Sequence, residues 1–273
     1  NGTYKLFSWG RNSSGQLGDN STTNRSSPVQ VNSNTWLKVS AGDQFSAGIV
    51  YYNSLRGFLY TWGRNDAGQL GDGSTSNRTV PTKIIYGTYP QYMWDNITTG
   101  YKHCLATANN YLAGFFLAWG SNNSGQLGNN NNSTYYSPIK VPMPAGNGKV
   151  LEAGGDTSAI INNYNKLYMF GDNTKGQVGN NTSGNFINSP QYLLYGATQV
   201  QIASKTRANS TTFIKTGDYV TGKIYSWGYA NAGILGDGTT VDKSSPVQVG
   251  SSTNWIKLSK TGGIGNITMF AIQ

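Results

Sequence analysis

Five copies of one segment recur through the chain at a nearly constant spacing, and this repeat restricts the available folds more than any other feature. Each copy joins an aromatic residue and a glycine to a turn of the type Gly-Gln-Leu-Gly. The copies are SWGRNSSGQLGD at 8–19, TWGRNDAGQLGD at 61–72, AWGSNNSGQLGN at 118–129, MFGDNTKGQVGN at 169–180 and SWGYANAGILGD at 226–237. Their aromatic residues stand 53, 57, 51 and 57 residues apart. A proline follows each copy with nearly the same step, so two independent markers define one repeating unit.

Each unit contains four short segments with the alternating pattern of β-strands, separated by turns rich in Gly and Ser. We name them A, B, C and D, as in Trp36–Ser40, Ser46–Val50, Phe58–Trp62 and Pro81–Ile85. The proline at the start of D fits an outermost strand, because an edge strand can spare one amide donor. Four antiparallel strands per unit, without helical periodicity, are typical of a β-propeller blade.

The two ends of the sequence each supply half of such a blade. The chain opens with a C and a D strand (Tyr4–Trp9 and Pro28–Val31) and closes with an A and a B strand (Trp255–Ser259 and Ile267–Ile272). We therefore predict an all-β fold, a single domain over residues 1–273. It is a propeller of about five four-stranded blades whose last blade is closed by the N- and C-terminal strands together. The predicted units are approximately 35–91, 92–146, 147–197, 198–252, and 253–273 joined with 1–34.

The aromatic-Gly pair, the Gly-Gln-Leu-Gly turn and the Ser-Pro-Val strand resemble the regulator-of-chromosome-condensation repeat family over essentially the whole chain. The resemblance implies a propeller fold. Most members of that family have seven blades, whereas five units are present here. The fourth unit departs from the pattern, with Phe170 for Trp, Val178 for Leu, and 205–207 in place of a Gly-rich turn.

Composition argues against nucleic-acid binding, a membrane span and an internal disulfide. The charge of +9 arises from 20 basic residues that are scattered, against only 11 acidic ones, so we expect a mild attraction to acidic surfaces and do not predict nucleic acid as the partner. A membrane span needs about 18 consecutive apolar residues, and the sequence has no such run. The single cysteine, Cys104, cannot form an internal disulfide and is predicted to be a small buried hydrophobe.

The sequence shows no arrangement of residues that is typical of a catalytic site or a metal site. His103 stands alone in a turn, without the carboxylate or thiol neighbours of a zinc site or a catalytic triad. The acidic residues of the Gly-Gln-Leu-Gly turns, Asp19, Asp72 and Asp237, are better explained by Asx-turn bonding than by calcium. The tryptophans of the Trp-Gly pairs are predicted to be packing anchors rather than stacking or light-sensing groups. We therefore predict no enzyme activity, no catalytic residue, no metal site and no cofactor.

Strand alternation assigns the loops to two faces, with the A–B and C–D loops on one of them. Tyr, Arg, Asn and Phe on short loops give large contact area and adaptable hydrogen bonds, so this face is the predicted partner-binding face. Its predicted residues are Arg11, Gln44, Phe45, Arg64, Tyr101, Lys102, His103, Asp156, Lys205, Arg207 and Tyr229.

Three functions suit a non-catalytic propeller with this face. The first is a protein-interaction or structural module of an extracellular assembly, a phage virion or bacterial surface protein. Low charge and loops rich in Asn, Ser, Thr and Tyr favour it. Its partner would be another protein or a virion or surface component, and the chain would act as an oligomer within a larger assembly. The second is a soluble inhibitor that plugs an enzyme active site with one propeller face. The third is an exchange factor or chromatin-type module, although the basic tail and inserted wedge of the family's founding member are absent.

Overall fold

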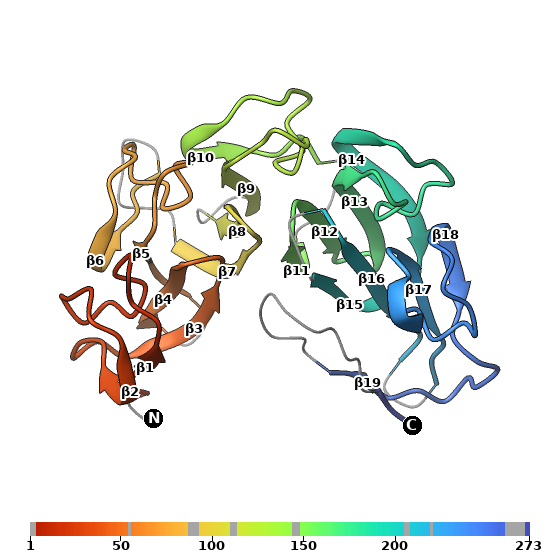
Figure 1. The fold of residues 1–273 in the computed structure, drawn as a ribbon, viewed down its shortest axis with the longest axis horizontal. Coiled ribbons are helices and arrows are strands. Elements are labelled where there is room, and N and C mark those ends of the chain that lie inside the picture. The colour runs from red at the N-terminus through yellow and green to blue at the C-terminus, as the bar shows by residue number, and fades with distance from the viewer. Residues whose placement is uncertain are drawn as a thin grey trace. The chain divides into compact units, whose positions relative to one another are not determined.

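A computed structural model describes residues 4–53, 56–86, 93–109, 114–143, 148–204, 208–218, 221–259 and 271–273 (Figure 1). The described chain is built from β-strands with one short 3-10 helix, which confirms the predicted all-β class. It divides into two compact units. Unit 1 comprises residues 1–121 and 133–141, and unit 2 comprises residues 122–132 and 142–273. No described helix has the length and hydropathy that crossing a membrane requires.

Unit 1 contains one two-stranded sheet and one eight-stranded sheet. The small sheet pairs β1 (Phe7–Gly10) with β2 (Arg25–Gln30). The large sheet contains β3 (Trp36–Ala41), β4 (Phe45–Asn53), β5 (Arg56–Gly63), β6 (Arg78–Lys83), β7 (Met93–Thr99), β8 (His103–Asn109), β9 (Gly114–Gly120) and β10 (Tyr135–Lys140). Consecutive strands pair antiparallel within β3–β6 and within β7–β10, in the order A, B, C, D. The pair Gly57–Trp94 links the two sets.

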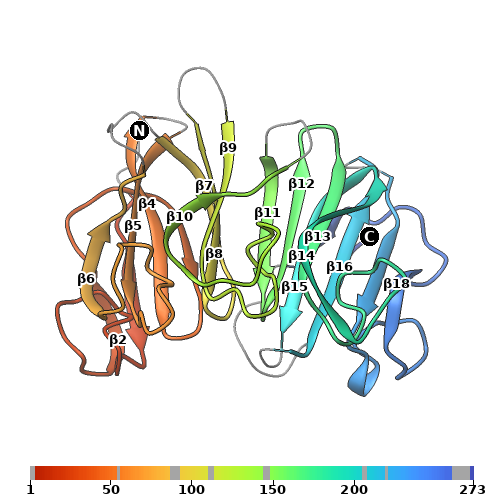
Figure 2. The same cartoon turned by 90° about the horizontal axis from the view of Figure 1, so that it is seen from above.

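Unit 2 contains two four-stranded antiparallel sheets and one two-stranded sheet. Its strands are β11 (Gly148–Gly154), β12 (Thr157–Asn162), β13 (Lys166–Asn173), β14 (Asn185–Tyr195), β15 (Ala197–Ser204), β16 (Ser210–Thr216), β17 (Ile224–Gly228), β18 (Lys243–Gln248), β19 (Lys257–Leu258) and β20 (Ala271–Ile272). The 3-10 helix, Asn231–Gly233, lies in the last C–D loop. Figure 2 shows the strands of each set running side by side, with their turns at two opposite ends. The predicted order of A to D holds in β11–β14, the set that contains the divergent Phe170 and Val178, and also in β15–β18.

The aromatic residue of each inner repeat is buried against a glycine of the preceding repeat. A Cβ added at Gly71 would lie 2.6 Å from Nε1 of Trp119, and Gly18 and Gly179 stand in the same relation to Trp62 and Trp227. The indole N–H groups donate to main-chain carbonyls of the same preceding turns, those of Gln16, Gln69 and Gln177. Phe170 packs likewise on Gly128. The prediction that the tryptophans of the Trp-Gly pairs are packing anchors is confirmed for Trp62, Trp119 and Trp227, whereas Trp9 is 62% exposed.

A buried asparagine organises the long C–D loop of four repeats, at Asn12, Asn65, Asn122 and Asn173. In the second repeat, Nδ2 of Asn65 donates to Asp72 Oδ1 at 3.2 Å and to the carbonyl of Ser74 at 3.0 Å, while its Oδ1 accepts the amide of Leu70. Asp72 in turn accepts the amide of Ser74 at 3.0 Å. Asp19 and Asp237 each accept the amide two residues later, so the predicted Asx-turn bonding is confirmed.

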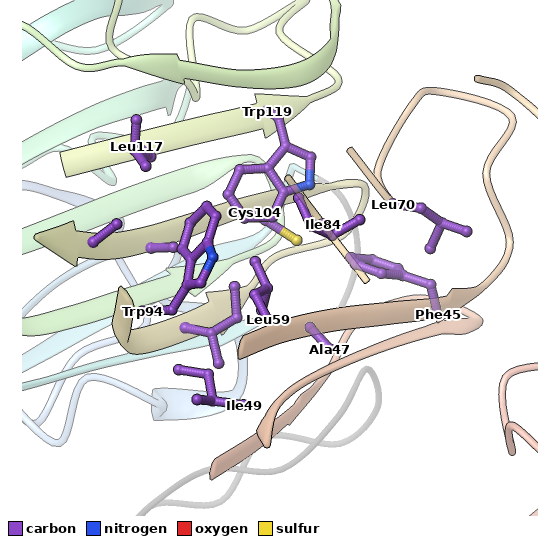
Figure 3. Packing of buried hydrophobic residues seen from close by; sticks show 13 residues of the cluster. Phe45, Ala47, Ile49, Leu59, Leu70, Ile84, Trp94, Cys104, Leu117 and Trp119 are labelled. Carbon is purple, nitrogen blue, oxygen red and sulfur yellow. The ribbon is translucent and has the colours of Figure 1, made fainter. Parts of the chain in front are cut away.

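The core of unit 1 lies between neighbouring sets of strands (Figure 3). It contains Trp94 and Trp119, whose rings meet edge to face with centroids 6.0 Å apart. Cys104 lies in the same cluster, and its burial raises the pKa of the thiol well above its usual value. The prediction that Cys104 is a small buried hydrophobe is confirmed.

The predicted ring closure lies outside what the structure describes. Ile267–Ile272 falls mostly within 260–270, and the closing pair would join a strand of unit 1 to a strand of unit 2. Each half-blade does form its own predicted pair, since β1 pairs with β2 and β19 pairs with β20. The single domain, the closure and the number of five blades stay predictions.

Candidate functional site

A repeated main-chain hydrogen bond places the A–B turn beside the start of the C–D loop. The amide after the aromatic-Gly pair donates to a carbonyl of the A–B turn of the same repeat, or, in the case of Tyr229, to the first residue of strand B. The bonds are Arg64 to Gln44 at 2.8 Å, Ser121 to Lys102 at 2.8 Å, Asp172 to Asp156 at 2.9 Å and Tyr229 to Ser210 at 3.1 Å. Within each of these four repeats the two loops therefore share one face, as strand alternation predicts.

On this face of unit 1, four charged side chains form a connected cluster. Arg64 lies 2.6 Å from Asp66 and 3.6 Å from Asp43, and Lys102 lies 2.7 Å from Asp66. Burial alone would raise the pKa of Asp66, but hydrogen bonds from Lys102, Gln69 and Arg64 lower it to about 2. Two cations thus meet two carboxylates, and the cluster carries no excess charge to attract a phosphate backbone.

Beside this cluster lies a surface hollow of ≈390 Å³, lined in part by Trp9, Arg11, Gln16 and Gln44. Trp9 is 62% exposed, unlike its buried counterparts in the inner repeats. The side chain of Arg11 is exposed and donates to Ser13 Oγ at 3.0 Å. Trp9 is not among the predicted residues of the face, because its position in the repeat is that of a packing anchor.

Six of the predicted residues keep side chains that reach solvent: Arg11, Gln44, Arg64, Tyr101, Lys102 and Tyr229. The first five belong to unit 1, where the amide of Asp43 also donates to the carbonyl of Tyr101. Tyr229 belongs to unit 2. Lys205 and Arg207 lie outside the described residues. The binding role of all these residues stays a prediction.

Three of the predicted side chains are buried instead, which corrects the prediction that they line the surface. Phe45, His103 and Asp156 are 1%, 0% and 1% exposed. Phe45 packs into the core of unit 1. His103 begins β8 opposite Gly120, and burial lowers its pKa to about 3, so the ring is neutral at physiological pH. Phe45 and His103 begin strand B of their repeats, and Asp156 directly precedes it. Because the A–B turns are short, residues at these positions are covered by the C–D loop instead of reaching the surface.

The described part of the chain contains no set of side chains suited to bind a metal ion. No group of three or more His, Cys, Asp or Glu side chains gathers there. The absence of a cofactor and of enzyme activity stay predictions.

Comparison with known proteins identifies the repeat. The family description "Regulator of chromosome condensation (RCC1) repeat" matches residues 5–49, 56–107, 114–161 and 221–263. The ultraviolet-B receptor UVR8 of Arabidopsis thaliana is 27% identical over 89% of this chain, which spans 65% of the receptor's length. The probable E3 ubiquitin-protein ligase HERC3 of Homo sapiens is 30% identical over 81% of this chain, which spans 20% of the ligase.

Two solved structures share the fold. Human WBSCR16 superposes with a TM-score of 0.75 at 20% identity, covering 94% of this chain and 65% of that one. Prp20p of Saccharomyces cerevisiae, whose structure was reported with its binding to Gsp1p and histones, gives 0.54 at 19% identity over 94% of this chain and 76% of that one. The matched repeats cover well over half of the sequence, and the chain belongs to the RCC1 repeat family.

Proposed function

We propose that the chain is a non-catalytic protein-interaction module that binds a partner protein through the A–B and C–D loops of unit 1. The observation that carries the proposal is the charge-balanced cluster of Asp43, Arg64, Asp66 and Lys102 beside the hollow lined in part by Arg11 and Gln44. Arginine is among the side chains that contribute most to protein interfaces, and paired charges at the rim set orientation.

A protein partner suits this face better than a nucleic acid. Nucleic-acid affinity depends on unpaired Lys and Arg that neutralise phosphates. Arg64 and Lys102 instead hold carboxylates within 2.7 Å. The overall charge of +9 is therefore not focused on this face.

We also propose that the repeats form a five-bladed ring in which the terminal half-blades complete one blade. Two features of the separate units support this. In unit 1, Trp9 is exposed although Trp62 and Trp119 each pack on a glycine. In unit 2, Gly236 occupies the matching place in the fifth repeat, and a Cβ there would meet only a Val249 methyl, at 3.2 Å.

The predicted location in a virion or other extracellular assembly remains a proposal, as does the inhibitor function, because the names of UVR8, HERC3, WBSCR16 and Prp20p point to neither. The similarity to Prp20p favours the third function, an exchange factor or chromatin-type module, as a second candidate. A direct assay is a binding titration of this chain with Gsp1p and with histones, the proteins named as binding to Prp20p. Binding to either would support this candidate, and no binding to either would exclude it for those partners.

The interaction proposal is tested by comparing proteins captured on the immobilised wild-type chain and on two variants. The triple variant R11A/R64A/K102A removes the cations of the proposed face. The matched control K83A/K140A/K257A removes three exposed lysines elsewhere. We expect specific partners to be lost from the first variant and kept by the control. Capture that survives the first variant, with both variants folded by circular dichroism, would refute the assignment of this face.

A further inference from the structure

A second hollow lies in unit 2, at one end of the four-stranded sheet β11–β14. It has a volume of ≈520 Å³ and is lined by Asn163, Tyr164, Asn165, Lys166 and Tyr195. These residues come from the turn between β12 and β13 and from the end of β14. The A–B turn of the same sheet, at Gly154–Thr157, lies at the other end of β12. Within unit 2, the hollow therefore lies at the end of β12 opposite to the A–B turn.

Two tyrosines on its wall are exposed to solvent. Tyr164 is 55% exposed and Tyr195 is 67% exposed. In the part of the chain that the structure describes, neither phenol hydroxyl has a hydrogen-bond partner. The neighbouring Tyr192 differs, because its ring packs on Tyr168 with centroids 5.9 Å apart. The rings of Tyr164 and Tyr195 thus remain available to a ligand.

The turn that carries Tyr164 is held rigidly by the protein. Oδ1 of the buried Asn162 accepts the amides of Tyr164 at 3.1 Å and Lys166 at 3.0 Å. Asn165 has a left-handed backbone, with φ 57°, and its carbonyl accepts the amides of Gly196 at 2.9 Å and Ala197 at 3.2 Å. These bonds tie the turn to the end of β14. A ligand would meet side chains whose main chain is already ordered, which lowers the entropic cost of binding.

We propose that this hollow binds a carbohydrate. An aromatic ring presents a flat face to the C–H groups of a sugar ring, and carboxamides offer donors and acceptors to its hydroxyls. Tyr164 and Tyr195 supply the rings, and Asn163 supplies a carboxamide. Asn165 supplies its Nδ2 donor, since its Oδ1 already accepts Lys149 Nζ at 2.9 Å. Lys166 adds one positive charge, which suits a hydroxyl oxygen or the carboxylate of an acidic sugar.

Other ligand classes match the lining less well. Among the described residues, no aliphatic side chain lines the hollow, so a protruding apolar side chain of a protein would find little to pack against. None of these lining residues is a carboxylate, which disfavours a cationic ligand. A nucleic-acid strand could stack its bases on tyrosine, but it also needs a series of cations for its phosphates, and the lining that the structure describes contributes one, Lys166.

The test begins with an array of neutral and acidic oligosaccharides, followed by titration calorimetry of the full chain with the tightest binder. Y164A and Y195A should each weaken the association constant about tenfold, the size expected when one stacking contact is lost, and the double variant should abolish binding. Y164F should retain affinity within about threefold, because the ring face remains. Y51A is the matched control, since Tyr51 is 44% exposed in unit 1, and it should bind like the wild type.

The proposal fails if no oligosaccharide binds, or if the double variant binds as well as the wild type. Single-stranded poly(U) is titrated in parallel. Binding of poly(U), but of no sugar, that is lost in the double variant would overturn the proposal in favour of a base-stacking site. Thermal melts by circular dichroism show whether the variants remain folded, and because these residues are exposed, we expect unchanged melting temperatures.

Discussion

The indole Nε1–H of Trp62 donates to the carbonyl of Gln16 at 2.9 Å, across 46 residues of sequence. The ring also covers Gly18, so one side chain fastens the C strand of one repeat to the turn of the repeat before it. Trp119 and Trp227 repeat the arrangement. The Trp-Gly pair and the Gly-Gln-Leu-Gly turn recur together in the sequence because the contact between neighbouring repeats, here called the joint, needs a residue from each motif.

Two substitutions at Trp62 should distinguish how much the packing of its ring and how much its hydrogen bond contribute to the stability of the fold. Trp62→Ala should cost about 3–5 kcal/mol, as the loss of a large buried aromatic side chain does. Trp62→Phe should cost less, because Phe170 fills the same place over Gly128 without an N–H donor. Urea denaturation provides the measurement. Equal and small losses for both variants would show that the joint does not depend on Trp62.

Gly71→Ala should destabilise the fold more than the same change at Gly184. Both glycines have left-handed backbones, with φ of 73° and 81°. A Cβ at Gly71 would collide with the Trp119 ring, whereas nothing lies within 4 Å of a Cβ at Gly184. The Gly184 variant should therefore lose only the conformational term of about 1–2 kcal/mol, and the Gly71 variant should lose a further 1–3 kcal/mol, roughly the cost of overpacking. A comparison of the two unfolding free energies isolates the steric contribution, which would be refuted by equal losses.

Asn122→Ala and Asn123→Ala form a matched pair of neighbours in one loop. Asn122 is buried, and its Nδ2 donates to Asn129 Oδ1 at 2.9 Å and to the carbonyl of Asn131 at 2.8 Å. Asn123 is exposed. The first change should cost about 2–3 kcal/mol, because buried loop groups lose their partners, and the second should cost less than about 0.5 kcal/mol. Thermal melts of both variants check the difference, and a tolerant Asn122 would mean that the loop is held by other contacts.

The sequence was sufficient to predict the strands and the pairing of loops on one face, because alternation and the proline of strand D are local signals. The bond from the Arg64 amide to Gln44 confirms that face assignment. The burial of Phe45, His103 and Asp156 could not be read from the turns, since the depth of a loop residue depends on the loop that covers it. The buried asparagines were missed although Asn recurs at one position in four of the five copies. Asparagine is normally a surface residue, so the repetition was the only signal of its role.

His103 should make the stability of the chain depend on pH between about 7 and 5. Burial lowers its pKa to about 3 in the folded protein, whereas the unfolded chain has the ordinary value of 6.5. Below pH 6.5 the unfolded state therefore binds a proton that the folded state does not, and the free energy of unfolding falls as the pH falls. His103 is the only histidine of the chain, so no other side chain with an ordinary pKa titrates in this range. Urea denaturation at pH 7, 6 and 5 should show a decline for the wild type and a nearly flat profile for His103→Asn. A flat wild-type profile would show that the imidazole is not excluded from protonation, and hence not buried as the structure places it.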